Sequence, residues 1–153
     1  MSWFRRRRCT EPLAAALGAV ELRRPWIRPD AARPDQAGGY LAITHKAAAP
    51  DRLLTAASPK AAAIEIHGIR VIGGDIAMRH LPEGLVLPPA SAITLQPRGY
   101  HLLLKDVQGP LAAGSRVPVA LSFERAGTIE ILFLVEEAGL VGEAILDEDR
   151  HRP

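Results

Sequence analysis

The stretch RVPVALSFERAGTIEILFLV, residues 116–135, shows a clear alternation of apolar and other side chains. Its first half has apolar residues at every second position, at Val117, Val119, Leu121 and Phe123. A period of two puts these side chains on one face of a β-strand. The turn signal ERAG, residues 124–127, separates this strand from a second apolar stretch, TIEILFLV. The sequence here therefore predicts two β-strands connected by a turn.

Similar short segments follow one another from about Val20 onward. They are VELRRPWI, GYLAITHK, DRLLTAAS, AAIEIHGIRV, IAMRHL, LVLPPASAITLQP and GYHLLLKDV. Turn signals such as IGGD and QPRG separate them, and the 13 prolines suit strand starts, edges and turns. No segment combines the length and the caps that a helix needs. Many short strands at regular spacing predict an all-β protein, an antiparallel sandwich or barrel.

The length of 153 residues fits one domain with additional segments at both ends. We expect a flexible leader or weak signal segment over residues 1–19, the β domain over 20–137, and a charged tail over 138–153 that is disordered or holds a short helix. Four arginines followed by PLAAALGA loosely resemble a secretory signal, but Glu11 and Pro12 interrupt the pattern. An export signal and an arginine-rich leader therefore both stay open. No apolar run approaches the roughly 20 residues that span a bilayer.

Composition and motifs argue against several classes of function. The net charge of +2 is too small to indicate nucleic-acid binding. The sequence contains no Gly-x-Ser-x-Gly, GxxxxGK[ST] or GxGxxG motif, and its carboxylates fall mostly at turns and tails. The single cysteine, Cys9, allows neither an intramolecular disulfide nor a CxxC site. We therefore expect a protein that is not an enzyme.

Histidine and methionine offer the remaining chemistry. His67 lies on the polar face of the segment AAIEIHGIRV, and His101 lies on the polar face of GYHLLLKDV. Met78 is the single methionine beyond the initiator. Two imidazoles and a thioether brought together by strands suit a soft or borderline ion, and a thioether in particular selects Cu(I). Solvent-facing histidines and a methionine that fills the core are the alternative interpretation.

The ordered segments IEIH, the following Met78, LQPRGYH and LSFERAG resemble the PCuAC family of periplasmic copper chaperones, over about Val20 to Val135. That family's metal motif is a histidine, then a methionine, then a His-x-Met pair. In this chain 10 residues separate His67 from Met78, and 22 separate Met78 from His101, close to the family's spacing. The resemblance implies a cupredoxin-like Greek-key β-sandwich or barrel, with His67, Met78 and His101 as metal ligands.

The chain departs from the family at the last position of this motif. Leu103 stands where the second methionine should be, and leucine has no lone pair to donate to a metal. Residues 101 and 103 share one face of a strand, so that in a complete motif both side chains reach one ion. His80, two residues after Met78, is the auxiliary ligand in this interpretation. A nitrogen-rich site of this kind would tolerate Cu(II) or Zn(II) better.

The resemblance implies a protein that carries Cu(I) and transfers it to an acceptor metalloprotein, such as the copper-site subunit of cytochrome oxidase or another copper chaperone. Two hypotheses stay open at the level of sequence. Either the three ligands still hold copper, or the site is degenerate and the domain is a metal-free protein-interaction module without a cofactor. The family is periplasmic, but a cytoplasmic location also stays open because the leader is a poor signal.

Overall fold

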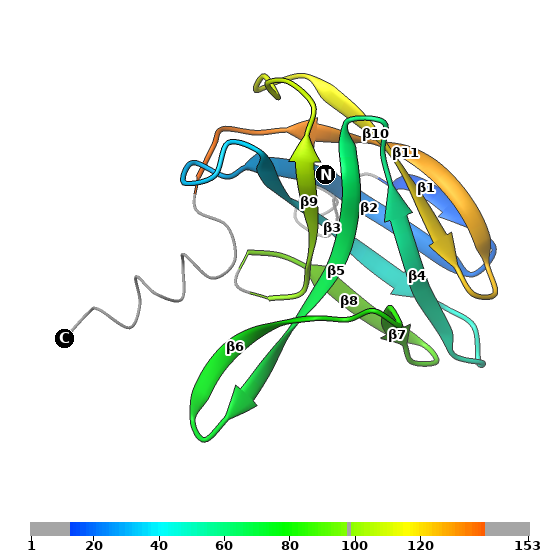
Figure 1. Cartoon of the computed structure of the whole chain (residues 1–153). Coiled ribbons are helices and arrows are strands. Elements are labelled where there is room, and N and C mark those ends of the chain that lie inside the picture. Colours follow the sequence, from blue (N-terminus) through cyan, green and yellow to red (C-terminus); the bar gives the residue numbers. More distant parts are fainter. Residues whose placement is uncertain (1–12, 98, 140–153) are drawn as a thin grey trace, which may run out of the picture.

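The structure is a computed structural model that describes residues 13–97 and 99–139, and Figure 1 shows their path. This part of the chain is built from strands and turns and has no helix. The strands are β1 (Leu13–Leu17), β2 (Val20–Pro29), β3 (Gln36–His45), β4 (Asp51–Ala57), β5 (Ala61–Ile72), β6 (Asp75–His80), β7 (Leu85–Leu87), β8 (Ser91–Leu95), β9 (His101–Val107), β10 (Arg116–Phe123) and β11 (Gly127–Val135). The predicted all-β class is confirmed. No helix capable of crossing a membrane occurs within the described residues.

All of these strands belong to one sheet, which curls into a half-barrel (Figure 1). The strand order is β6-β5-β9-β3-β2-β11-β10-β4-β7, while β1 also pairs with β2 and β8 with β3. The pairs are antiparallel except for one. Strand β11 runs parallel to β2, with Leu134 opposite Trp26. The sheet is therefore mixed rather than purely antiparallel as expected, because β11 pairs with β2 in the same direction.

The core lies on the concave side of this curled sheet and follows the predicted alternation. The four alternating residues of β10, which are Val117, Val119, Leu121 and Phe123, are buried. They pack in one cluster with buried residues of the other strands, among them Leu22, Ile43, Leu53, Leu102 and Phe133. Burying a side chain of this size stabilises the fold by about 1.5–3 kcal/mol. The alternation in residues 116–135 therefore correctly indicates which face is covered.

The β domain begins before residue 20. Leu13–Leu17 forms β1 and pairs with the start of β2, with Leu17 opposite Val20. Gly18 has a positive φ of 58° in the turn between them, which glycine adopts without strain. Residues 13–17 thus belong to the sheet rather than to the expected leader, because β2 offers them a strand edge to pair with. The rest of the expected leader and most of the expected tail lie outside the described residues.

The β5–β6 hairpin extends away from the rest of the sheet (Figure 1). The first part of β5 pairs with β9 up to His67, and from there to Ile72 it pairs with β6. Gly73 and Gly74 connect the two strands, with φ values of 58° and 89°. A two-residue turn with positive φ at both positions matches the twist of a hairpin and favours Gly-Gly. The turn signal IGGD therefore correctly predicts this hairpin.

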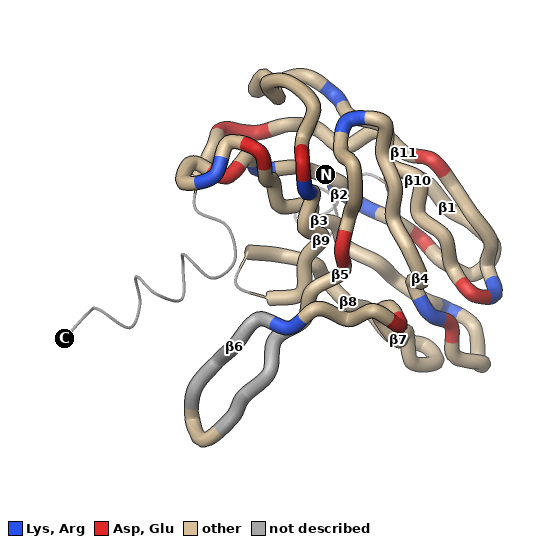
Figure 2. The backbone as a smooth tube through the Cα atoms, in the orientation of Figure 1, with Lys and Arg blue, Asp and Glu red and all other residues tan. Residues whose placement is uncertain are grey.

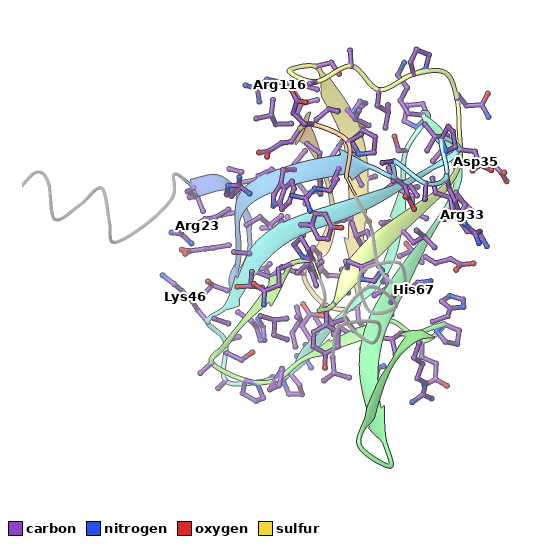
Figure 3. All side chains as sticks on the ribbon, turned by 90° about the vertical axis from the view of Figure 1, so that its left-hand side faces the viewer. Arg23, Arg33, Asp35, Lys46, His67 and Arg116 are labelled. Carbon is purple, nitrogen blue, oxygen red and sulfur yellow. The ribbon has the colours of Figure 1, made fainter. Side chains whose placement is uncertain are left out.

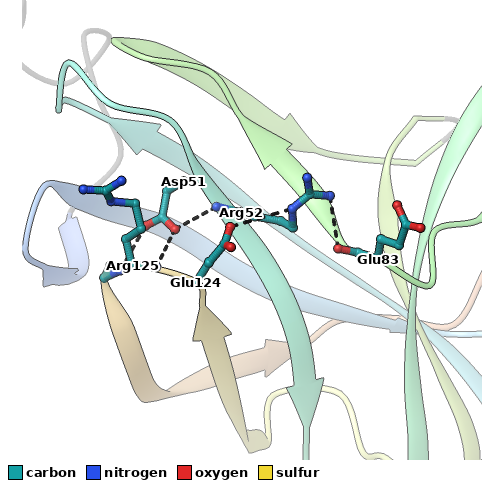
Figure 4. A network of polar contacts seen from close by, with 6 residues as sticks. Asp51, Arg52, Glu83, Glu124 and Arg125 are labelled. Atoms are coloured by element: carbon teal, nitrogen blue, oxygen red, sulfur yellow. Dashed lines mark hydrogen bonds and ion pairs between the residues drawn. The ribbon is translucent and has the colours of Figure 1, made fainter.

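A buried carboxylate ties β4 to the turn between β10 and β11 (Figure 4). Asp51 is 4% exposed, and its Oδ1 accepts hydrogen bonds from the backbone N–H groups of Arg52 at 2.7 Å and Arg125 at 2.8 Å. Its Oδ2 accepts a third from Ala126 at 3.0 Å. Burial alone would raise the pKa of Asp51, but the three backbone donors outweigh it and hold the pKa below the ordinary value. The carboxylate is thus ionised, and both of its oxygens accept hydrogen bonds from the backbone.

Charged side chains are spread over the described strands, with basic and acidic residues interspersed (Figure 2). Several of them pair across strands, such as Lys46 with Glu21 at 3.0 Å and Arg24 with Glu136 at 3.0 Å. Exposed pairs of this kind contribute little to stability. Within the described residues the charges do not gather into the single basic face that nucleic-acid binding requires.

Candidate metal site

Three histidines from neighbouring strands lie in one row, which we call the histidine row: His80 on β6, His67 on β5 and His101 on β9. In the register of the sheet His67 lies directly opposite His80 on one side and directly opposite His101 on the other. The ring centroids of His67 and His80 are 5.6 Å apart, and those of His67 and His101 are 5.4 Å apart. Figure 3 shows His67 on β5, above the level at which the hairpin extends. Two predicted ligands and the predicted auxiliary one are therefore brought together.

His101 is the buried end of this row. It lies on the face of β9 opposite to Leu102 and Leu104, as expected, but it is 2% exposed rather than solvent-facing. The ring of Tyr40, on the neighbouring strand β3, has its centroid 6.4 Å from that of His101. Nδ1 of His101 donates a hydrogen bond to the Gly99 carbonyl oxygen at 2.9 Å. The polar face that the sequence predicts is therefore buried at this point, with the ring of Tyr40 beside His101.

Burial also sets the protonation state of His101. Loss of hydration lowers the pKa of the imidazole, the nearby His67 lowers it further, and the hydrogen bond to Gly99 only partly opposes them. The ring is therefore neutral at neutral pH, which is the form that binds a metal ion. Because Nδ1 carries the proton that Gly99 accepts, the lone pair is on Nε2.

His67 lies at the centre of the row and is held by a carboxylate. Its Nε2 donates to Oε1 of Glu65 at 2.9 Å, and the His67 side chain is 16% exposed. Oε2 of Glu65 accepts a second hydrogen bond, from Nζ of Lys105 at 3.3 Å. Sequence reasoning missed Glu65, although its position two residues before His67 places it on the same face of β5. That spacing is the signal that could have found it.

Met78 occupies a register position on β6 opposite Ile69 of β5. It precedes His80 by two residues, so the two positions share one face of the hairpin. His67 shares that face, because residue 69 follows it by two along β5. The backbone therefore places residues 67, 78, 80 and 101 along one face of three neighbouring strands.

Leu103 lies two residues after His101 on β9 and is half-buried. It is opposite Glu65 on one side and opposite Gly38 on the other. Its position is thus next to the histidine row, two residues from His101 on the same strand. Among the described side chains, no three or more His, Cys, Asp or Glu groups are arranged to hold a metal ion.

The sequence profile of a family described as "Putative lipoprotein LpqE-like" matches residues 20–135. The chain belongs to the LpqE-like family. A relative from Leifsonia xyli subsp. xyli (strain CTCB07), "Putative lipoprotein Lxx21020", is 23% identical over 118 residues, which are 77% of this chain and 70% of the relative. The matched range begins at the start of β2 and ends at the end of β11. It therefore contains both His67 and His101.

Solved structures extend the relationship to the PCuAC domains. The copper-bound PCuAC domain from PmoF2 has a TM-score of 0.69 and 28% identity, over 80% of this chain and 97% of that domain. The apo form of the same domain has a TM-score of 0.70 and 26% identity, over 83% and 97%. The Cu(I) form of DR1885 from Deinococcus radiodurans has a TM-score of 0.62 at 22% identity, over 80% of each chain, and shows the same fold. Membership of the PCuAC family and its cupredoxin-like fold are confirmed.

Proposed function

We propose that this LpqE-like protein binds Cu(I) at the histidine row, through His67, His101 and Met78, and passes it to an acceptor metalloprotein without acting as an enzyme. The observation that carries the proposal is the direct pairing of His67 and His101, with ring centroids 5.4 Å apart. It is supported by homology to a domain with a copper-bound form. Copper is here the cargo, and the copper site of a cytochrome oxidase subunit or another copper chaperone is the class of acceptor that we propose.

The donors in this chain suit a metal that must leave again. Imidazole and thioether are uncharged ligands, so that no anionic ligand strengthens their hold on Cu(I). An acceptor can therefore displace them one at a time. His80 is exposed, and His67 keeps part of its side chain accessible. With Leu103 in place of a thioether, His80 is the fourth donor in our proposal. Its nitrogen makes the site more tolerant of Cu(II) or Zn(II) than a site with two thioethers.

We also propose a location outside the cytoplasm, in the periplasm or its equivalent. The support is the description of both the family and the Leifsonia relative as lipoproteins. In an oxidising compartment Cu(I) needs a carrier with soft ligands, and Met78 is the soft ligand available on this face. N-terminal sequencing of the protein from its host would show whether residues 1–19 are removed.

The test is a titration of the reduced full-length protein with Cu(I) against a competing Cu(I) chelator, followed by backbone NMR shifts. We expect one Cu(I) per chain, with the largest shifts at residues 67, 78, 80 and 101. Leu103, which has no lone pair to donate to a metal, favours a second candidate, a metal-free protein-interaction module. Failure of the protein to compete with the chelator at any ratio would rule out the copper site and leave that candidate.

Restoring the missing sulfur gives a sharper prediction. Leu103→Met is expected to tighten Cu(I) binding by about tenfold, which corresponds to about 1.4 kcal/mol, because a thioether at position 103 is next to the row. The measurement is the same chelator competition. Leu132→Met, at an exposed position of β11, is the matched control and should leave the affinity unchanged. Equal affinities for both variants and the wild type would mean that copper does not bind beside residue 103.

A further inference from the structure

The carboxylate of Glu65, on β5, contacts His67 of its own strand and Lys105 of the neighbouring strand β9. Its Oε1 accepts from Nε2 of His67 at 2.9 Å, and its Oε2 accepts from Nζ of Lys105 at 3.3 Å. The Glu65 side chain is 27% exposed, so water covers only part of it. Both carboxylate oxygens of Glu65 are thus held by hydrogen bonds, one from the same strand and one from β9.

These contacts determine which nitrogen of each imidazole can bind a metal. A carboxylate and a carbonyl oxygen are acceptors only, so the histidine nitrogen that faces each of them must carry the proton. In His67 that nitrogen is Nε2, which faces Glu65, and in His101 it is Nδ1, which faces Gly99. In the neutral form of each ring, the lone pair is therefore on Nδ1 of His67 and on Nε2 of His101. The two rings, whose centroids are 5.4 Å apart, therefore offer different nitrogens to a metal.

We propose that Glu65, braced by Lys105, is the positioning residue of the copper site, which fixes His67 as the Nδ1-binding tautomer and orients its ring toward His101. The inference rests on the proposed function and goes beyond its ligand set. A metal-bound histidine usually donates its other N–H to a carboxylate or carbonyl, and this partner fixes the tautomer and raises the basicity of the ligand. Glu65 and Gly99 fill this role for the two histidines here, before any metal is bound.

The position of Glu65 makes its role larger in this chain than in one with the full motif. Glu65 lies directly opposite Leu103 in the register of β5 and β9. A methionine at 103 would supply a second soft donor beside His101, so that the orientation of His67 would matter less. With leucine there, the ring of His67 has to be held correctly by Glu65. The loss caused by removing Glu65 should accordingly be smaller in a Leu103→Met background.

The experiment compares Glu65→Leu and Glu65→Gln with the wild type by Cu(I) competition and by long-range proton–nitrogen NMR of the imidazoles in the apo protein. Glu65→Leu should weaken Cu(I) binding by about 10- to 100-fold, the usual cost of losing such an outer partner, and His67 should become a mixture of tautomers. Glu65→Gln keeps an oxygen acceptor, so that it should keep the Nε2–H tautomer and recover most of the affinity. Glu130→Leu, an exposed strand glutamate on β11, is the control and should match the wild type.

Each outcome decides between specific alternatives. Unchanged affinity and an unchanged His67 tautomer in Glu65→Leu would overturn the positioning role while leaving the proposed function intact. A wild-type protein that binds no Cu(I) would overturn the proposed function itself. If affinity falls in Glu65→Leu but the tautomer of His67 does not change, Glu65 acts other than by positioning, and the proposal is wrong. An equal loss in Glu65→Gln and Glu65→Leu would also contradict it.

Discussion

Replacing His101 by glutamine should weaken Cu(I) binding by about 100-fold or more. Losing a residue that only holds a ligand costs about 10- to 100-fold, and losing the ligand itself should cost at least as much. In the proposed site His101 is a neutral nitrogen donor, because burial lowers the pKa of its imidazole and Gly99 accepts the proton on Nδ1. Glutamine is close in size and keeps an N–H that can donate to Gly99. It offers no imidazole lone pair to copper. The competition titration with a Cu(I) chelator measures the loss.

A second buried histidine provides the matched control. His45, at the end of β3, is 4% exposed, and its Nε2 donates to the Ala49 carbonyl oxygen at 2.7 Å. It lies opposite Val20 and Ser91, outside the histidine row. His45→Gln therefore makes the same chemical change in a similar environment and should leave the Cu(I) affinity unchanged. If both variants lose the same affinity, His101 acts through general stability and is not a ligand.

The pairing of His67 with His80 could have been predicted from the sequence. The IGGD signal predicts a two-residue turn, and such a turn fixes the register of a hairpin. Counting outward from Gly73 and Gly74 places residue 67 opposite residue 80, as the structure has it. The pairing of His67 with His101 is different, because β6, β7 and β8 separate β5 from β9 in the chain. No local turn fixes that register, and only the family's motif indicated that these two histidines meet.

Two other features depend on contacts between distant segments. Residues 13–17 have too little alternation to indicate a strand, and they form β1 because the edge of β2 is available to them. His101 is buried, and the ring of Tyr40 from β3 lies beside it. Alternation along a strand shows that two faces differ, but it does not show what covers each face. Sequence analysis therefore predicted the strands more reliably than the surroundings of the side chains that they carry.

Replacing Asp51 by asparagine should lower the free energy of unfolding by about 2–3 kcal/mol, since hydrogen bonds to a charged group are among the stronger ones and leaving a buried donor unpaired is costly. Asp51 accepts from three backbone N–H groups, those of Arg52, Arg125 and Ala126. Asparagine keeps one oxygen and turns an NH2 group toward at least one of these donors. Urea unfolding at neutral pH, with an unchanged dependence on denaturant, measures the loss.

The stability difference between wild type and Asp51→Asn should depend on pH. Because the pKa of Asp51 is lower in the folded than in the unfolded state, the carboxylate stabilises the fold fully above the ordinary aspartate pKa of 3.8. That stabilisation is lost as the pH falls through the folded-state pKa, when the carboxyl becomes protonated. The difference in stability between wild type and Asp51→Asn should therefore be largest at neutral pH and shrink in acid. A difference that stays constant down to the most acidic pH would mean that shape, rather than charge, explains the effect.

Asp30 provides the control, because it is a buried aspartate with fewer backbone hydrogen bonds than Asp51. It is 7% exposed, and its Oδ1 accepts one backbone hydrogen bond, from Ala32 at 2.9 Å. Asp30→Asn should therefore cost about 1 kcal/mol, the usual contribution of a single hydrogen bond. Equal losses in the two variants would contradict the special role of Asp51. The larger loss is expected at Asp51 because its carboxylate connects β4 to the turn that follows β10, two segments that are far apart in the chain (Figure 4).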